Sequence, residues 1–179
     1  MRSAIALAVL ALSAACASEK AEVKPSVDES KAAFERIKAL AGDWSGPGGE
    51  GAEMATVNVR YRVTAAGSVV EETIMPGTPH EMISMYYLDN GRLKMTHYCS
   101  AGNQPTMFAQ PQAAQDTSVA KVNFVFDHGT NMADSKVAHM HALELEFRGN
   151  DRLVTKWANW SDGKLGHEAT FQLERKTWN

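Results

Sequence analysis

Histidine side chains dominate the chemistry that this sequence could support, because five of its six histidines fall on apolar faces of predicted strands. Alternate residues of a strand share a face, so His97 lies on the same face as Leu93 and Met95. The same rule gives apolar faces to His128, His139, His141 and His167. Histidine is usually of intermediate burial, and a buried imidazole needs a hydrogen-bond partner. The pattern therefore predicts polar groups inside the fold.

Polar groups on apolar strand faces are typical of a cavity that holds a small, partly apolar ligand. Glu72 has a strand parity compatible with the same interior. The candidate ligand-binding residues are Tyr86, His97, Cys99, His139, His141 and His167. We expect a small-molecule ligand, but the sequence identifies neither the molecule, nor a cofactor, nor an oligomeric state.

Two other interpretations of the histidines stay open. The His139-x-His141 pair, completed by His97 or His167, is a plausible strand motif for a metal ion or haem. Alternatively, the histidines are hydrogen-bonded core residues of a structural envelope protein without a ligand. An H-x-H pair alone does not separate these interpretations, because it carries no information about the groups around the ligands.

An enzymatic function is less favoured. Cys99 lies two residues from His97, and such neighbours in one strand are about 6.5–7 Å apart at the backbone, too far for direct activation of a thiol. The chain also has no P-loop, Rossmann glycine pattern, G-x-S-x-G or H-E-x-x-H motif. The sequence therefore assigns no catalytic residue.

Composition restricts the class of protein further. The chain has 179 residues, of which 44% are hydrophobic, and this suits one domain with one core. It carries 18 Lys and Arg against 21 Asp and Glu, a formal net charge of −3. Proteins that bind nucleic acid are usually basic, so we expect no nucleic-acid partner.

The first residues predict export. Residues 1–15 combine one basic residue, a short apolar run and small residues, the layout of a secretory signal. Cys16 follows Ser13-Ala14-Ala15 in a pattern that resembles a bacterial lipobox, although ordinary cleavage near Cys16 is the alternative. Residues 16–30 would then form a polar tether. We expect a protein of the bacterial periplasm, or one held at the outer membrane only through a lipidated Cys16. Cys99 would then be left without a disulfide partner.

The elements that must position the histidines are mostly strands. Residues 28–41 predict one helix, capped by Asp28 or Ser30 and ended by Gly42. From Met54 onward the apolar period becomes two, with turn signals between the runs. The predicted strands are 54–63, 68–75, 81–89, 92–100, an edge strand near 105, 121–128, 138–149, 151–160 and 164–176. With a short strand at Trp44, about eight or nine consecutive strands indicate a mainly β fold, a single antiparallel up-and-down β-barrel.

The segment after the helix also suggests a family. Gly42-Asp43-Trp44 resembles the G-x-W motif of lipocalins and related calycins. In that family the Trp closes one end of the barrel beneath a basic side chain of the last strand, for which Arg175 and Lys176 are the candidates here. The stretch from Val59 to Met107 looks like a group of exported bacterial lipocalin-like proteins. The resemblance implies a lipocalin-like barrel domain over residues 31–177, with structural roles for Trp44 and Arg175, and it implies little about function.

Overall fold

The computed structural model describes residues 24–111, 120–134 and 136–177. The predicted signal segment, Cys16 and most of the predicted tether lie outside these residues. No helix in the described part of the chain is long and apolar enough to cross a membrane.

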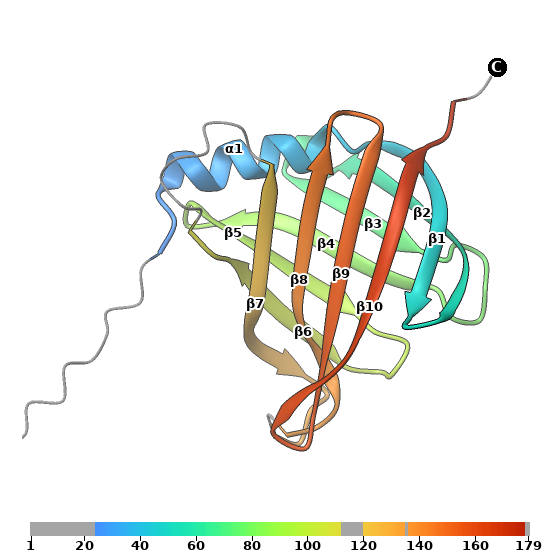
Figure 1. Ribbon diagram of the computed structural model, residues 1–179. Helices are drawn as coiled ribbons and strands as arrows, with labels where there is room; N and C mark the ends of the chain where they lie inside the picture. The colour runs from blue at the N-terminus through green and yellow to red at the C-terminus, as the bar shows by residue number, and fades with distance from the viewer. Residues whose placement is uncertain (1–23, 112–119, 135, 178–179) are drawn as a thin grey trace, which may run out of the picture.

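Ten antiparallel strands form a closed barrel in which each strand pairs with its neighbours in the sequence (Figure 1). The strands are β1 (Gly42–Glu50), β2 (Glu53–Thr64), β3 (Val69–Ile74), β4 (Met82–Asp89), β5 (Arg92–Tyr98), β6 (Gln104–Ala109), β7 (Lys121–Thr130), β8 (His139–Arg148), β9 (Arg152–Ser161) and β10 (Lys164–Arg175). A short 3-10 turn, η1 (Ala65–Gly67), joins β2 to β3. The predicted fold class, a mainly β up-and-down barrel with one N-terminal helix, is confirmed, although the strands number ten.

Strand β1 closes the barrel by pairing with both β2 and β10. Its sequence, GDWSGPGGE, lacks the alternation of a half-buried strand. The small residues are needed because β1 and β10 approach closely: a Cβ atom at Gly46 would collide with the carbonyl oxygen of Gln172. This close packing explains why a glycine-rich segment serves as a full-length strand.

The helix α1 (Val27–Lys38) covers one end of the barrel. Its N-cap is Ser26, which accepts a hydrogen bond from the Glu29 amide in a capping box. The predicted caps, Asp28 and Ser30, were therefore wrong, because Glu29 is placed to complete the box with Ser26. The helix ends at Lys38, with Ala39 as its C-cap, rather than at Gly42, which already belongs to β1.

The end of the barrel under α1 is filled by side chains, and we call it the closed end. Trp44 is 1% exposed there, and its Nε1 donates a hydrogen bond of 2.7 Å to the Leu40 carbonyl. The guanidinium of Arg175 lies 4.4 Å from the Trp44 ring centroid and donates hydrogen bonds to the carbonyl oxygens of Ala39 and Ala41. Arg175, rather than Lys176, is thus the basic residue that lies over the tryptophan.

Candidate functional site

A cavity of about 350 Å³ lies at the opposite end of the barrel, which we call the open end. This volume falls within the range of small-molecule sites. Its wall comes from the β1–β2 hairpin and from parts of β3, β4, β5, β8, β9 and β10 that are remote from the helix. Most of the wall is apolar, formed by Val57, Ile74, Met75, Met82, Met140, Ala169 and Phe171. The open end thus offers a pocket for an apolar body.

Two polar ring side chains, His97 and Trp157, also line this cavity. Both are buried, and their ring centroids are 4.8 Å apart. Within the described residues, neither Nε2 of His97 nor Nε1 of Trp157 has a hydrogen-bond partner, and the buried hydroxyl of Thr155 on β9 has none either. Buried polar atoms are normally paired with protein groups or ordered water. The side chains of the wall therefore carry hydrogen-bonding groups that no described residue uses, at atoms that are themselves buried.

His97 is the last member of a chain of polar residues that crosses four adjacent strands. Tyr61, Glu72, Ser84 and His97 lie directly opposite one another in the pairing of β2, β3, β4 and β5. We call these four residues, together with Tyr86, the polar row. Glu72 accepts hydrogen bonds of 2.6 Å from the Tyr61 hydroxyl and 2.7 Å from the Tyr86 hydroxyl. Ser84, the residue of β4 opposite Glu72, has its Oγ 3.1 Å from His97 Nδ1.

Burial sets the charge of the polar row. Desolvation raises the pKa of Glu72, while hydrogen bonds from Tyr61, Tyr86 and Ser84 act in the opposite direction. The pKa values of both tyrosines are raised well above their usual range, first by burial and then by the Glu72 charge. Burial lowers the pKa of His97 to about 4. His97 is therefore an uncharged imidazole at neutral pH.

The predicted site residues separate in the structure. His97 lines the cavity, and Tyr86 lies behind it in the polar row. Cys99 lies just beyond the end of β5, is partly exposed and does not line the cavity. His167 and His128 are exposed, with 84% and 61% of their side chains accessible, so the parity rule was wrong for them. Both lie near irregularities of strand pairing, where alternation no longer assigns a face.

His139 and His141 form a separate aromatic cluster next to a bulge in β8. The register shifts between Met140 and Ala142, and Met140 takes the place in the cavity wall. His139 is buried, with Nδ1 2.6 Å from the Val137 carbonyl and Nε2 3.0 Å from Nδ1 of His141. The His141 ring stacks between those of Phe126 and Trp160. Neither histidine lines the cavity, so the six candidates do not form one site.

Metal-ligating side chains are not gathered into a centre in the described part of the chain. Over residues 24–111, 120–134 and 136–177, no group of three or more His, Cys, Asp or Glu side chains is placed to hold a metal ion. The nearest carboxylate to the exposed ring of His167 is that of Glu50, at 3.9 Å. His97 bonds to Ser84, and His139 bonds to His141, so each is engaged in its own surroundings.

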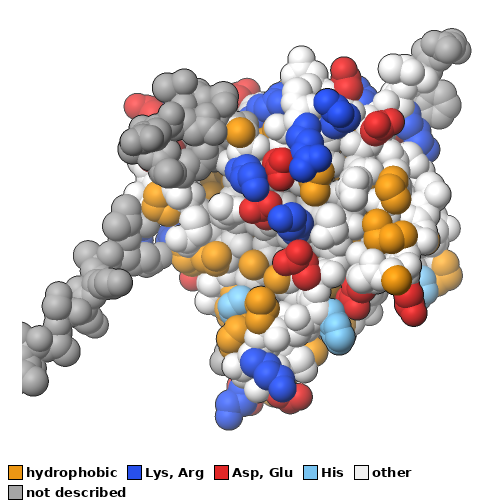
Figure 2. All heavy atoms as spheres, in the orientation of Figure 1, with side chains coloured by type: hydrophobic (Ala, Val, Ile, Leu, Met, Phe, Trp, Pro, Cys, Tyr) orange, Lys and Arg blue, Asp and Glu red, His pale blue; other side chains and the backbone are white. Residues whose placement is uncertain are grey.

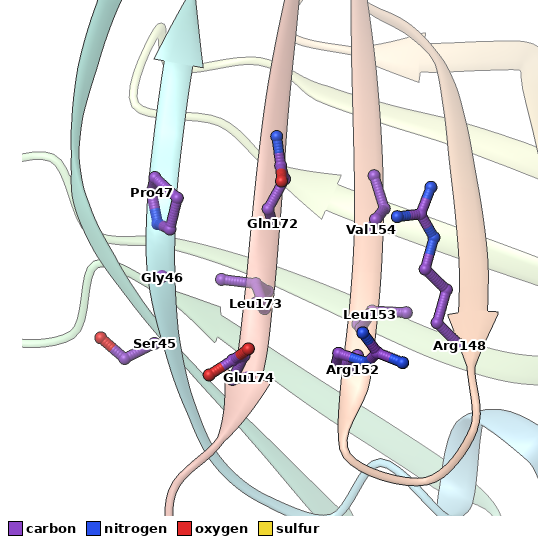
Figure 3. A pocket seen from close by; sticks show the side chains of 10 residues that line it. All are labelled: Ser45, Gly46, Pro47, Arg148, Arg152, Leu153, Val154, Gln172, Leu173 and Glu174. Atoms are coloured by element: carbon purple, nitrogen blue, oxygen red, sulfur yellow. The ribbon is translucent and has the colours of Figure 1, made fainter.

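A second hollow, of about 280 Å³, lies on the outer face of the barrel across β1, β10, β9 and β8 (Figure 3). Charged side chains border it, namely Arg148, Arg152 and Glu174. Arg148 pairs with Glu146 at 2.8 Å, and positive and negative side chains intermingle over this face (Figure 2). Exposed ion pairs of this kind contribute little energy, so the hollow has less to offer a ligand than the mainly apolar cavity at the open end.

Comparison of the sequence with models of protein families and with curated proteins gives no match. The closed ten-stranded antiparallel barrel is consistent with a lipocalin-like protein but is not specific to that family. The functional argument therefore rests on the geometry of the cavity.

Proposed function

We propose that the barrel binds a small, mainly apolar molecule in the cavity at its open end, with one polar group of the ligand beside His97 and Trp157. One observation carries this proposal: two buried ring nitrogens have no partner among the described residues, in a mainly apolar wall whose other polar side chains are Glu53 and Thr56. A ligand that supplies the missing hydrogen bonds would be favoured over an entirely apolar one, because a buried polar group without a partner is destabilising.

Binding fits the chemistry of this wall better than catalysis does. A general base works best when its pKa lies near the operating pH. The pKa of His97, lowered to about 4, makes its imidazole a weak base at neutral pH. A weakly basic, neutral imidazole is well suited to hold a hydrogen bond without transferring a proton.

A neutral fluorescent probe tests the proposal. We expect N-phenyl-1-naphthylamine to bind the purified protein at one site per chain and to gain fluorescence as it leaves water. Ala169 lies on the cavity face of β10, so Ala169→Phe places a large side chain in the cavity. This variant should abolish the gain in fluorescence. Gln172→Phe is the matched control, because Gln172 is an exposed residue of the same strand.

Two results would contradict the proposal. One is the absence of saturable binding to the wild-type protein. The other is equal binding by the Ala169→Phe and Gln172→Phe variants, which would place the probe outside the cavity. Native mass spectrometry of the protein as purified gives an independent measurement, since a retained small molecule should be present in the wild type and absent from Ala169→Phe.

We also propose, from the sequence, that the barrel works outside the cytoplasm, with residues 1–15 as a signal and Cys16 as a lipid anchor. Cys16→Ser should move the protein from the membrane fraction to the soluble exported fraction of a bacterial cell. Unchanged fractionation of this variant would overturn the proposed anchor. The ligand-binding proposal would be unaffected, because the cavity lies within the described barrel.

A further inference from the structure

The mouth of the cavity lies at the β1–β2 hairpin, and the charge there limits what the ligand can be. This inference rests on the proposed ligand-binding function and deepens it by naming a ligand class. Alternate residues of a strand share a face, so Glu53 and Ala55 lie on the same face of β2 as the buried Val57. Both residues line the cavity, and both are exposed. The cavity therefore meets the solvent beside them.

Two carboxylates occupy opposite positions at this mouth, and we call Glu50 and Glu53 the acidic pair. They are directly opposite in the pairing of β1 and β2, and Glu50 shares its face of β1 with the buried Trp44. Like charges directly opposite each other in an antiparallel pair are destabilising. Within the described residues, Glu53 makes no ion pair, and Glu50 lies near one basic ring, that of His167 at 3.9 Å, which is charged only when protonated.

The acidic pair belongs to the same row of inward-facing residues as Trp157. Glu53, Glu50, Ala169 and Trp157 are directly opposite one another across β2, β1, β10 and β9. Adjacent strands lie about 4.8 Å apart, so Glu50 and Trp157, which are two strands apart, are separated by about 10 Å at the backbone. Ala169 lies between them and lines the cavity with a small side chain. An apolar chain of this length therefore reaches from the acidic pair to Trp157 over Ala169.

Positive side chains do not balance the acidic pair inside the cavity. Among the described residues that line it, Glu53 is the only Asp, Glu, Lys or Arg. The cavity volume and the unpartnered ring nitrogens of its wall are the independent signs of a ligand, and the acidic pair bears on the charge of that ligand. A metal ion is less favoured, because no group of three or more metal-ligating side chains is present in the described part of the chain.

We propose that the ligand is an apolar ammonium compound, whose charged nitrogen lies between Glu50 and Glu53 and whose apolar part extends over Ala169 toward Trp157. An ammonium group only donates hydrogen bonds and an ionised carboxylate only accepts them, and hydrogen bonds between charged groups are stronger than those between neutral ones. This charged group is additional to the polar group that lies beside His97 and Trp157. A ligand with a carboxylate at the mouth is disfavoured, because the acidic pair would repel it.

Three probes with one chain length test this inference: octylammonium, 1-octanol and octanoate. They are titrated at slightly alkaline pH, where histidine is uncharged, and binding is followed by the ¹⁵N–¹H signal of the Trp157 indole. An exposed ion pair changes an affinity by about fivefold at most. Since the acidic pair attracts one probe and repels another, we expect octylammonium to bind about tenfold more tightly than octanoate, with 1-octanol between them. Added salt should reduce this preference.

A double variant tests the cause of the preference. Glu50→Gln combined with Glu53→Gln keeps the shape of both side chains and removes their charge, so octylammonium and octanoate should bind about equally while the affinity for 1-octanol is unchanged. The variant should fold, because it removes a like-charge pair from the hairpin. Glu35→Gln combined with Glu174→Gln is the matched control, since it makes the same change in net charge at two exposed residues, of α1 and of the last turn-distal part of β10. Its preference should equal that of the wild type.

The outcomes separate this inference from the function on which it rests. If no probe perturbs the Trp157 signal, the proposed function is overturned, and the inference with it. If 1-octanol binds but octylammonium binds no more tightly than octanoate, or if the double variant keeps the preference, the cavity still binds ligands but the ammonium assignment is wrong. Displacement of octylammonium by calcium chloride, and not by sodium chloride of the same ionic strength, would show a metal site at the acidic pair and would also overturn the assignment.

Discussion

The closed and open ends of the barrel are built from the same strands, yet their interiors are filled differently. At the closed end, large side chains such as Trp44, Phe34 and Ile37 are buried against one another. At the open end, the wall contains small residues, flexible methionines and the His97–Trp157 pair around an empty volume. The closed end is thus filled by large side chains of α1 and β1, whereas the open end leaves a cavity inside the barrel.

Polar groups differ between the ends in the same way. At the closed end, Arg175 donates to the carbonyl oxygens that follow the last turn of α1, and the indole of Trp44 donates to Leu40. At the open end, the ring nitrogens of His97 and Trp157 have no partner within the described chain. Pairing is not complete at the closed end either, since the buried Ser30 hydroxyl of α1 has no partner among the described residues, so the two ends differ in the kind of unpaired group: a hydroxyl at one, two ring nitrogens at the other.

The largest loss of stability should come from truncating Trp44 at the closed end. Trp44→Ala removes a side chain that is 1% exposed and leaves a void beneath Arg175. We expect a loss of about 3–5 kcal/mol in the free energy of unfolding, as for other buried aromatic residues. Urea denaturation followed by far-ultraviolet circular dichroism measures it. A loss below about 1 kcal/mol would show that Trp44 is not part of a tightly packed end.

Acid should weaken the open end through His97. The pKa of His97 is about 4 when folded and 6.5 in its ordinary state, so the unfolded chain binds more protons between these values. The contribution of His97 to the free energy of unfolding is present in full above pH 6.5. It falls by at most about 3 kcal/mol as the pH drops towards 4. His97→Gln is the control for this dependence of stability on pH. It removes the imidazole but keeps Glu72, whose raised pKa affects both proteins. Parallel stability curves for the two proteins would contradict the prediction.

The smallest single effect is expected at Met82, one of a matched pair of methionines on neighbouring strands. Met95 is fully buried in the packed interior, whereas Met82 is partly exposed and lines the cavity. We expect Met95→Ala to lower the free energy of unfolding by about 2–5 kcal/mol. Met82→Ala should lower it by less than about 1 kcal/mol, because its neighbours already lack contacts on one side. Equal losses would show that the two regions are packed alike.

The fold was largely predictable because its strands are joined by short turns with strong sequence signals. Asn90-Gly91 and Asp162-Gly163 both adopt the positive φ angles that such turns require. Strand β1 was harder to recognise over its full length. Its glycines are needed because β10, which is distant in the sequence, packs too close for larger residues. Tertiary packing of that kind leaves no periodic signal within the segment itself.

The candidate site was predictable where strand pairing is regular. Parity alone brought His97, Tyr86 and Glu72 to the interior, and all three belong to the polar row. Tyr61 and Ser84 share that row, and their positions on alternating strands were the signal that could have found them. The faces of His141 and His167 could not be derived, because each lies at a register shift in the strand pairing. The residue types at these positions do not predict such a shift. Trp157 was missed because a tryptophan in a strand usually signals packing rather than binding.

Closure of the barrel by β1 and β10 has a consequence for how the chain folds. Every other strand pair joins consecutive segments and can form as a local hairpin. The contacts of β1 with β10, such as those of Trp44 with Arg175 and of Gly48 with Phe171, join opposite ends of the domain. Contacts of high sequence separation carry a larger entropic cost of loop closure and slow folding. A sheet of hairpins should therefore assemble first, and the last event of folding, the seam at β1 and β10, is the one that encloses the cavity.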